Sequence, residues 1–176
     1  MDHLPQTPNT FREMVEADLR RAGRLVIKVQ DEIDPQWRIA SPSADWRIAT
    51  TLPAGDDHGR RAILRALSTF MVWKQALAFT LASELVEPDC VYCCGVSASE
   101  RWACLAPITR RTRPWTKAHF GAVEWLPANS IDPAIAELLP TVPRPLTPKE
   151  VSAMVKWFGK DGKFPAVNMA TGETGA

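Results

Sequence analysis

Residues 37–49, Trp-Arg-Ile-Ala-Ser-Pro-Ser-Ala-Asp-Trp-Arg-Ile-Ala, contain one four-residue sequence twice. The segment between the copies, residues 41–45, has the length and residue types of a hairpin turn. Residues 25–29 alternate apolar side chains around a lysine, which is typical of a strand. We therefore expect a β-meander of three strands. Trp37 and Trp46 share a position in the two copies, so we expect them to form a cross-strand pair or to line one sheet face in the core.

A second hairpin is predicted further along the chain. Residues 90–96 and 101–108 have strand composition and are separated by the turn Ser-Ala-Ser-Glu. Symmetric pairing about this turn would place Cys93 opposite Cys104. One more strand is expected over residues 122–126, and sequential hairpins favour antiparallel pairing.

The longest predicted helix begins after Asp56 or Asp57 and extends to about Leu85. Its apolar positions cover well over half of the helix circumference, which is more than a surface helix needs. We expect it to form the centre of the core, with a homodimer interface as an alternative. Lys74 lies in the middle of the apolar arc, where we expect it either to extend its ammonium group to water or to pair with a carboxylate such as Glu124.

Short helices are predicted at both ends of the chain. Thr10 and Glu13 form a capping-box pattern before a helix over residues 11–22. Residues 147–150, Thr-Pro-Lys-Glu, open a last helix that ends near Gly159. The predicted fold is a single α+β domain over residues 1–168, with an antiparallel sheet of two hairpins plus one strand packed on the long helix. Residues 169–176 are predicted to be a flexible tail.

The composition limits the classes of function. The 176 residues contain 21 Lys and Arg against 20 Asp and Glu, a net charge of +1. This balance excludes a DNA mimic and a wholly basic coat protein. The first residues lack a secretory signal, and charges interrupt the apolar region 62–86. A cytoplasmic protein with no membrane role is expected.

The sequence predicts neither a cofactor nor a metal site. Cys90, Cys93, Cys94 and Cys104 lack the spacing of paired zinc knuckles, so we expect buried free thiols. Phosphate-binding glycine loops and nucleophile-elbow motifs are also missing from the sequence. We therefore expect a protein that is not an enzyme, and the alternative is a small enzyme that uses Lys74 or a cysteine.

One basic segment is the candidate binding site. No acidic residue occurs from Arg101 to Val123. Residues 108–117 of this stretch contain four cations and one indole: Arg110, Arg111, Arg113, Lys117 and Trp115. Guanidinium groups bind phosphates and carboxylates, and an indole can stack on a base or anchor an interface. The predicted partner is a host protein or ribonucleoprotein complex, or nucleic acid directly; the alternative is a solvated loop with its indole folded onto the core.

Four segments of the chain are similar to segments of other proteins: Phe79–Leu85, Phe120–Leu126, Trp157–Gly159 and Gly162–Val167. They resemble segments of uncharacterised accessory proteins of bacterial mobile elements, such as plasmids, integrative elements and phages. The resemblance implies a genetic setting in which small proteins often block or redirect host machinery, including restriction and CRISPR defence. Our first functional hypothesis is therefore a non-enzymatic interaction protein of a mobile element that inhibits a host defence complex.

Overall fold

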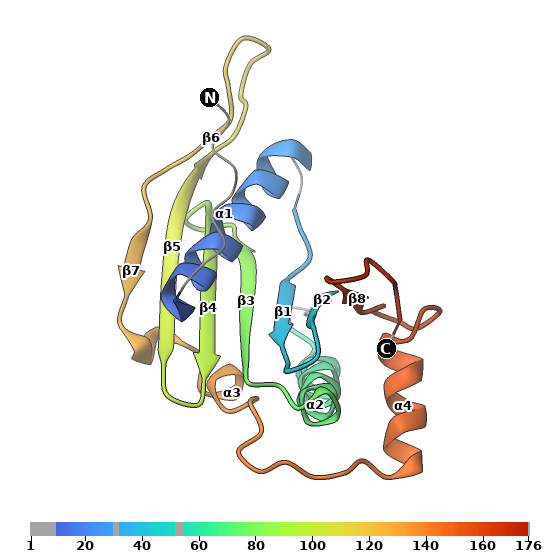
Figure 1. Ribbon diagram of the computed structural model, residues 1–176. Helices are drawn as coiled ribbons and strands as arrows, with labels where there is room; N and C mark the ends of the chain where they lie inside the picture. The colour runs from blue at the N-terminus through green and yellow to red at the C-terminus, as the bar shows by residue number, and fades with distance from the viewer. Residues whose placement is uncertain (1–9, 30–31, 52–54, 176) are drawn as a thin grey trace.

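The computed structural model describes residues 10–29, 32–51 and 55–175, and its centre is an antiparallel sheet (Figure 1). The strands are β1 (Gln36–Ala40), β2 (Asp45–Ala49), β3 (Ala78–Leu85), β4 (Cys90–Ser97), β5 (Arg101–Thr109), β6 (His119–Phe120), β7 (Glu124–Leu126) and β8 (Val167–Asn168). Their order is β6-β5-β4-β3-β1-β2-β8, and β7 also pairs with β5. The predicted α+β class and antiparallel sheet are confirmed.

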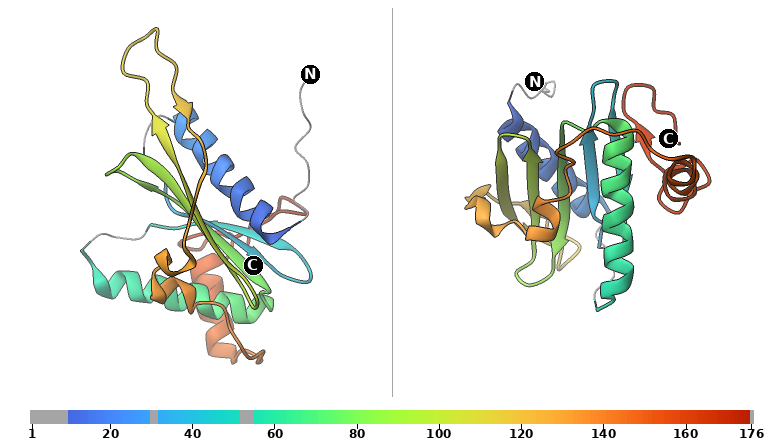
Figure 2. Two further views of the ribbon diagram at one scale, coloured as in Figure 1. Left: turned by 90° about the vertical axis from the view of Figure 1, so that its left-hand side faces the viewer. Right: turned by 90° about the horizontal axis from the view of Figure 1, so that it is seen from below.

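Helices cover both faces of the sheet. They are α1 (Phe11–Val29), α2 (Asp57–Lys74), α3 (Pro133–Ala136) and α4 (Pro148–Phe158), with a 3-10 turn at Ala128–Ser130. Figure 2 shows α1 on one face and α2 on the other. Each face therefore has its own apolar core: α1 packs on β3, β4 and β5, whereas α2, α3 and α4 pack on the opposite side of the same sheet.

The repeated Trp-Arg-Ile-Ala sequences form the β1–β2 hairpin, as predicted. Trp37 lies opposite Ile48 and Ile39 lies opposite Trp46, so the two indoles line one face of the sheet as neighbours on a diagonal. Both indoles belong to the core on the α2 side. Because side chains alternate along a strand, the arginine that follows each tryptophan points to the α1 side.

The predicted strand over residues 25–29 is wrong, because these residues form the end of α1. The helix predicted over residues 11–22 therefore continues through Gly23 to Val29. A Cβ at Gly23 would lie 2.4 Å from a ring carbon of Phe120, so this glycine allows β6 to approach the helix closely. Val26 is 1% exposed, and its burial against the sheet stabilises the last turns of α1. The meander is consequently a two-stranded hairpin.

The predicted long helix ends at Lys74 rather than at Leu85. Gln75 has φ 55°, a left-handed conformation, and the Ala76 N–H donates to the Met71 carbonyl oxygen at 2.9 Å. Residues 78–85 form β3, a central strand with both faces covered. A strand buried on both faces is apolar at consecutive positions. In the sequence, β3 therefore looks like a continuation of the apolar pattern of the helix. The long predicted helix is thus a helix followed by a strand.

The remaining predictions have different outcomes. The β4–β5 hairpin is confirmed, and Cys93 lies opposite Cys104. The helix α4 begins at Pro148 after Thr147, as predicted, and Glu150 completes a capping box with Thr147. Backbone bonds attach the C-terminal residues, among them those from the Met169 N–H to the Asp45 carbonyl oxygen at 2.8 Å and from the Gly175 N–H to the Ala166 carbonyl oxygen at 2.7 Å. Flexibility of residues 169–176 stays a prediction, and residue 176 lies outside the described residues.

Candidate functional site

The basic segment forms a loop that joins β5 to β6 and projects beyond the end of the sheet, as the yellow segment in Figure 1 shows. We call residues 110–118 the basic loop. Its turn is held by Thr116, whose hydroxyl oxygen accepts from the N–H groups of Thr112 at 3.2 Å and Arg113 at 3.0 Å. The same hydroxyl donates to the Arg113 carbonyl oxygen at 2.8 Å. The loop therefore has a defined turn at its tip.

Arg110 holds the base of this loop. Its Nε donates to Asp89 Oδ2 at 2.9 Å, and its Nη2 forms an ion pair with Glu84. The Glu84 side chain is only 3% exposed, so its charge depends on this guanidinium for compensation. Of the five predicted site residues, Arg110 thus has a structural role at the base of the loop.

Arg111 is also engaged by the loop itself. Its Nε donates to the Arg113 carbonyl oxygen at 3.3 Å, and its Nη2 donates to the Pro114 carbonyl oxygen. A hollow of about 470 Å³ lies beside it, between the loop and Ile27 of α1. Trp115 and Lys117 line the same hollow, which connects the loop to the neighbouring helix.

The indole of Trp115 is 75% exposed at the tip of the loop. The alternative in which this side chain folds back onto the core is therefore wrong. The guanidinium carbon of Arg113 lies 5.8 Å from the centre of the Trp115 ring, and Lys117 is exposed nearby in sequence. Tryptophan and arginine together are enriched among the residues that dominate binding energy at interfaces. The tip has the composition of a contact surface.

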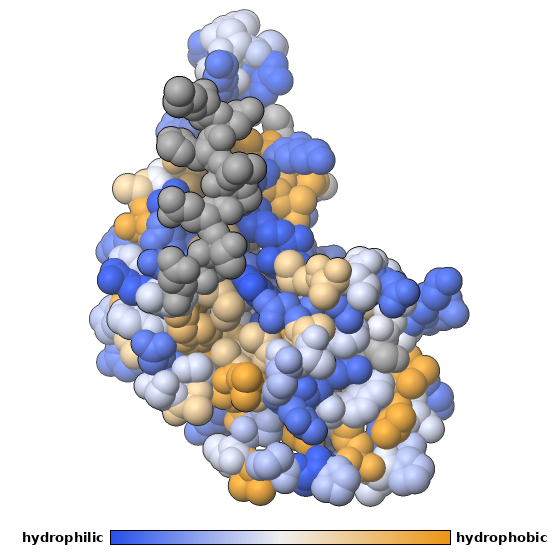
Figure 3. All heavy atoms as spheres, viewed as in Figure 1, coloured by the Kyte–Doolittle hydropathy of each residue, from blue (hydrophilic) through white to orange (hydrophobic). Residues whose placement is uncertain are grey.

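The projecting end of the molecule combines pale spheres of intermediate hydropathy with blue, hydrophilic groups, as the top of Figure 3 shows. The second half of α1 adds further cations there: Arg20, Arg21, Arg24 and Lys28. Arg20 forms an ion pair with Glu16, whereas none of the other three is in a salt bridge among the described residues. Two cationic segments, the basic loop and the end of α1, therefore lie at this end of the fold.

The alternative site residues are less suited to chemistry. All four cysteines are buried, and burial raises the pKa of Cys94 and of Cys104 to about 12. These thiols are protonated near neutral pH and are weak nucleophiles. No group of three or more metal-ligating side chains occurs among the described residues.

Of the two arrangements expected for Lys74, the ion pair with Glu124 is not among the salt bridges of the described residues, and the side chain is partly exposed. Its Nζ lies 3.9 Å from the ring centre of Trp73 and 4.3 Å from that of Trp46. Burial lowers the pKa of Lys74, and the two indole faces offer a partial substitute for water. The side chain joins the end of α2 to the β1–β2 hairpin, which is a structural role.

The sequence pattern did not predict a second cationic site, which surrounds the buried Asp18. This carboxylate is 5% exposed and lies between α1 and the sheet, where Arg47 and Thr80 contact it. The contributing residues are separated by 29 and 62 positions in sequence, so no local motif marks the site. Only the fold brings them together.

Comparison with protein-family models, with curated proteins and with solved structures finds no match to this chain. Within the described part of the chain, none of the helices combines the length and apolar character needed to cross a bilayer. The geometry of the two cationic sites is therefore the basis for the functional inference.

Proposed function

We propose that this chain is a non-enzymatic interaction protein whose basic loop docks on a phosphate-rich surface, as presented by a nucleic acid alone or within a ribonucleoprotein complex. The observation that carries the proposal is the 75% exposed indole of Trp115 between the exposed cations Arg113 and Lys117. Inhibition of a host defence complex, in the setting of a mobile element, is a narrower form of the same proposal.

Phosphate-rich surfaces fit the chemistry of this loop. An exposed aromatic ring can stack on an unpaired base, which contributes about 1–3 kcal/mol per base, and neighbouring cations neutralise the backbone. No carboxylate occurs from Arg101 to Val123, so nothing within the loop itself competes with phosphate for these cations. The further cations of α1 extend the positive field beside the loop and favour encounter with a polyanion.

The proposal is tested by fluorescence anisotropy with labelled single-stranded DNA, single-stranded RNA and duplex DNA, over about 50 to 200 mM salt. The informative variant combines Arg113→Ala, Trp115→Ala and Lys117→Ala, because all three side chains are exposed. We expect it to lose most affinity and to reduce the salt slope by about 1.4–1.8, since two phosphate contacts are removed. Arg110 is left intact, because its removal would leave Glu84 buried without its partner.

The matched control is Arg61→Ala, which removes an exposed cation from α2 on the opposite side of the sheet. It should bind as the unmodified protein does. Equal binding by the triple variant, or binding that does not depend on salt, would overturn the proposal. A nuclease-resistant protein retained from a bacterial lysate and lost in the triple variant would assign the loop to an acidic protein surface instead.

A further inference from the structure

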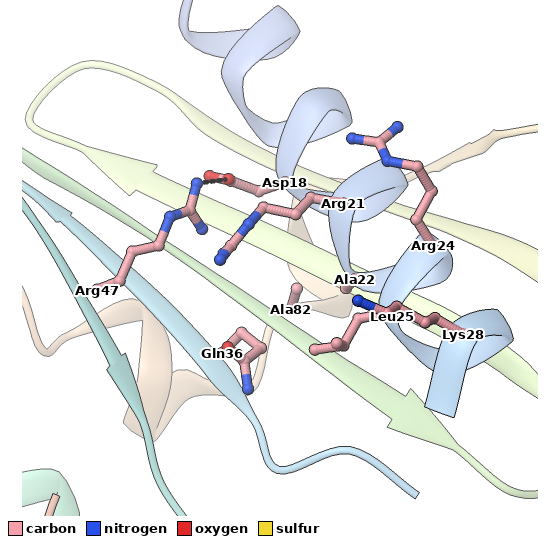
Figure 4. Close-up of a pocket in the computed structure, with 9 residues that line it drawn as sticks. All are labelled: Asp18, Arg21, Ala22, Arg24, Leu25, Lys28, Gln36, Arg47 and Ala82. Carbon is pink, nitrogen blue, oxygen red and sulfur yellow. Dashed lines mark hydrogen bonds and ion pairs between the residues drawn. The ribbon is translucent and has the colours of Figure 1, made fainter. Parts of the chain in front are cut away.

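A cavity of about 220 Å³ opens between α1 and strands β1, β2 and β3 (Figure 4). Four cationic side chains line it against a single carboxylate: Arg21, Arg24, Lys28 and Arg47 against Asp18. The guanidinium groups of Arg21 and Arg47 point into the space between helix and strand, whereas that of Arg24 points away from the sheet. Charge in this cavity is therefore strongly unbalanced.

The carboxylate cannot compensate this excess, because the sheet already uses both of its oxygens. Asp18 Oδ1 accepts from Arg47 Nη2 at 3.0 Å, and Oδ2 accepts from the Thr80 hydroxyl at 2.7 Å. Arg38 Nη1 lies a further 3.6 Å from Oδ2. Asp18 thus fixes Arg47 at the floor of the cavity, and among the residues that the structure describes no salt bridge includes Arg21 or Lys28.

Arg47 also has a hydrogen-bond donor that a bound anion could use. The Arg47 side chain is 16% exposed, and its Nε is buried without a hydrogen-bond partner among the described residues. Arg21, Arg24 and Lys28 are open to solvent at the mouth, so a ligand can reach the cavity. Burial lowers the pKa of Arg21, and the nearby charge of Arg47 lowers it further. A bound anion would relieve both effects.

We propose that this cavity binds the phosphate group of a small phosphorylated molecule. Guanidinium forks recognise phosphate oxygens through paired, charge-assisted hydrogen bonds, and Arg21 and Arg47 present two such forks across one gap. Lys28 supplies a third cation of the type that neutralises a phosphate as a point charge. Phosphate fits better than carboxylate because it can carry a second negative charge, which compensates more of the cationic excess in the cavity. The site is separate from the basic loop and does not depend on the function proposed for it.

The site is tested by isothermal titration with inorganic phosphate, glycerol 3-phosphate and adenosine 5′-monophosphate at constant ionic strength. We expect saturable one-to-one binding of at least one probe, and the preference among them tells free phosphate from an esterified one. Arg21→Gln removes one fork while keeping a polar side chain, and it should weaken binding at least tenfold. Arg20→Gln is the control, because Arg20 precedes it on the same helix but pairs with Glu16.

Thermal unfolding gives a second readout. Because Arg21 is held against like charges, Arg21→Gln should keep or raise the Tm of the ligand-free protein while abolishing the rise that the bound probe causes. A Tm that falls in this variant would mean that Arg21 is structural, which overturns the proposal. So would a complete lack of saturable binding, or equal binding by Arg21→Gln. The triple variant of the basic loop should bind the probes normally, so this site and the loop can fail independently.

Discussion

Replacing Asp18 by asparagine tests the centre of the α1–sheet interface. The carboxylate is 5% exposed and compensates two arginines, Arg38 and Arg47, which lie directly opposite each other on β1 and β2. Their side chains are 17% and 16% exposed, so little water screens their repulsion once the counter-ion is gone. The hydrogen bond from Thr80 would also be weakened, because an amide oxygen is neutral.

Removing one partner of a buried ion pair typically costs about 3–5 kcal/mol. Asp45 still binds Arg38 Nη2, so we expect the low end, about 3 kcal/mol. For a chain of this size that corresponds to a fall in Tm of about 6–12 °C. Tryptophan fluorescence during urea unfolding measures the free energy directly.

A matched control is Asp45→Asn, since Asp45 pairs with the same Arg38 but is 30% exposed. This change should cost less than about 1 kcal/mol, because water screens the exposed pair. If Asp18→Asn lowers the free energy of unfolding by no more than Asp45→Asn does, solvent compensates the charges of Arg38 and Arg47. The reasoning from burial would then be refuted.

Further predictions concern the glycine, the thiols and the base of the basic loop. Gly23→Ala should lower the free energy of unfolding by about 1 kcal/mol in urea titrations, because overpacking against the phenyl ring on β6 outweighs the gain in helix propensity. The free energy of unfolding should fall as pH rises from about 9 toward 12, because folding raises the pKa of Cys94 and of Cys104 to about 12. The fall is up to about 1.4 kcal/mol per pH unit for each thiol. Urea unfolding under reducing conditions at a series of pH values measures it, and a constant free energy over this range would contradict the prediction. Arg110→Ala should cost about 2–4 kcal/mol in the same assay, as the Glu84 carboxylate loses its guanidinium partner, and a cost near zero would show that this carboxylate finds another.

The sequence predicted those elements whose signals are local. The β1–β2 and β4–β5 hairpins each join strand-like residues through a short polar turn, and Thr147 with Glu150 marks the start of α4. The end of α2 was missed because Gln75 adopts the left-handed conformation that glycine usually provides. The central strand β3 was missed because burial on both faces removes the alternation that identifies a strand.

The candidate site was predictable only in part. Residues 108–117, with four cations, one tryptophan and no carboxylate, are visible in the sequence, and they include most of the projecting loop. The different roles of its arginines were not visible, because Glu84 and Asp89 reach Arg110 from the preceding hairpin. The cavity beside Arg21 and Arg47 could not be predicted at all, since it depends on the docking of α1 across the sheet.

The close approach of Phe120 to Gly23 lies between the two sites. Arg21 lines the cavity two residues before Gly23, and Phe120 ends the short strand that closes the basic loop. A shift of α1 that accompanies an anion in the cavity would therefore reach the foot of the loop at this contact. Should such a shift change the affinity of the loop for its partner by some factor, the partner must change the affinity of the cavity for the anion by the same factor.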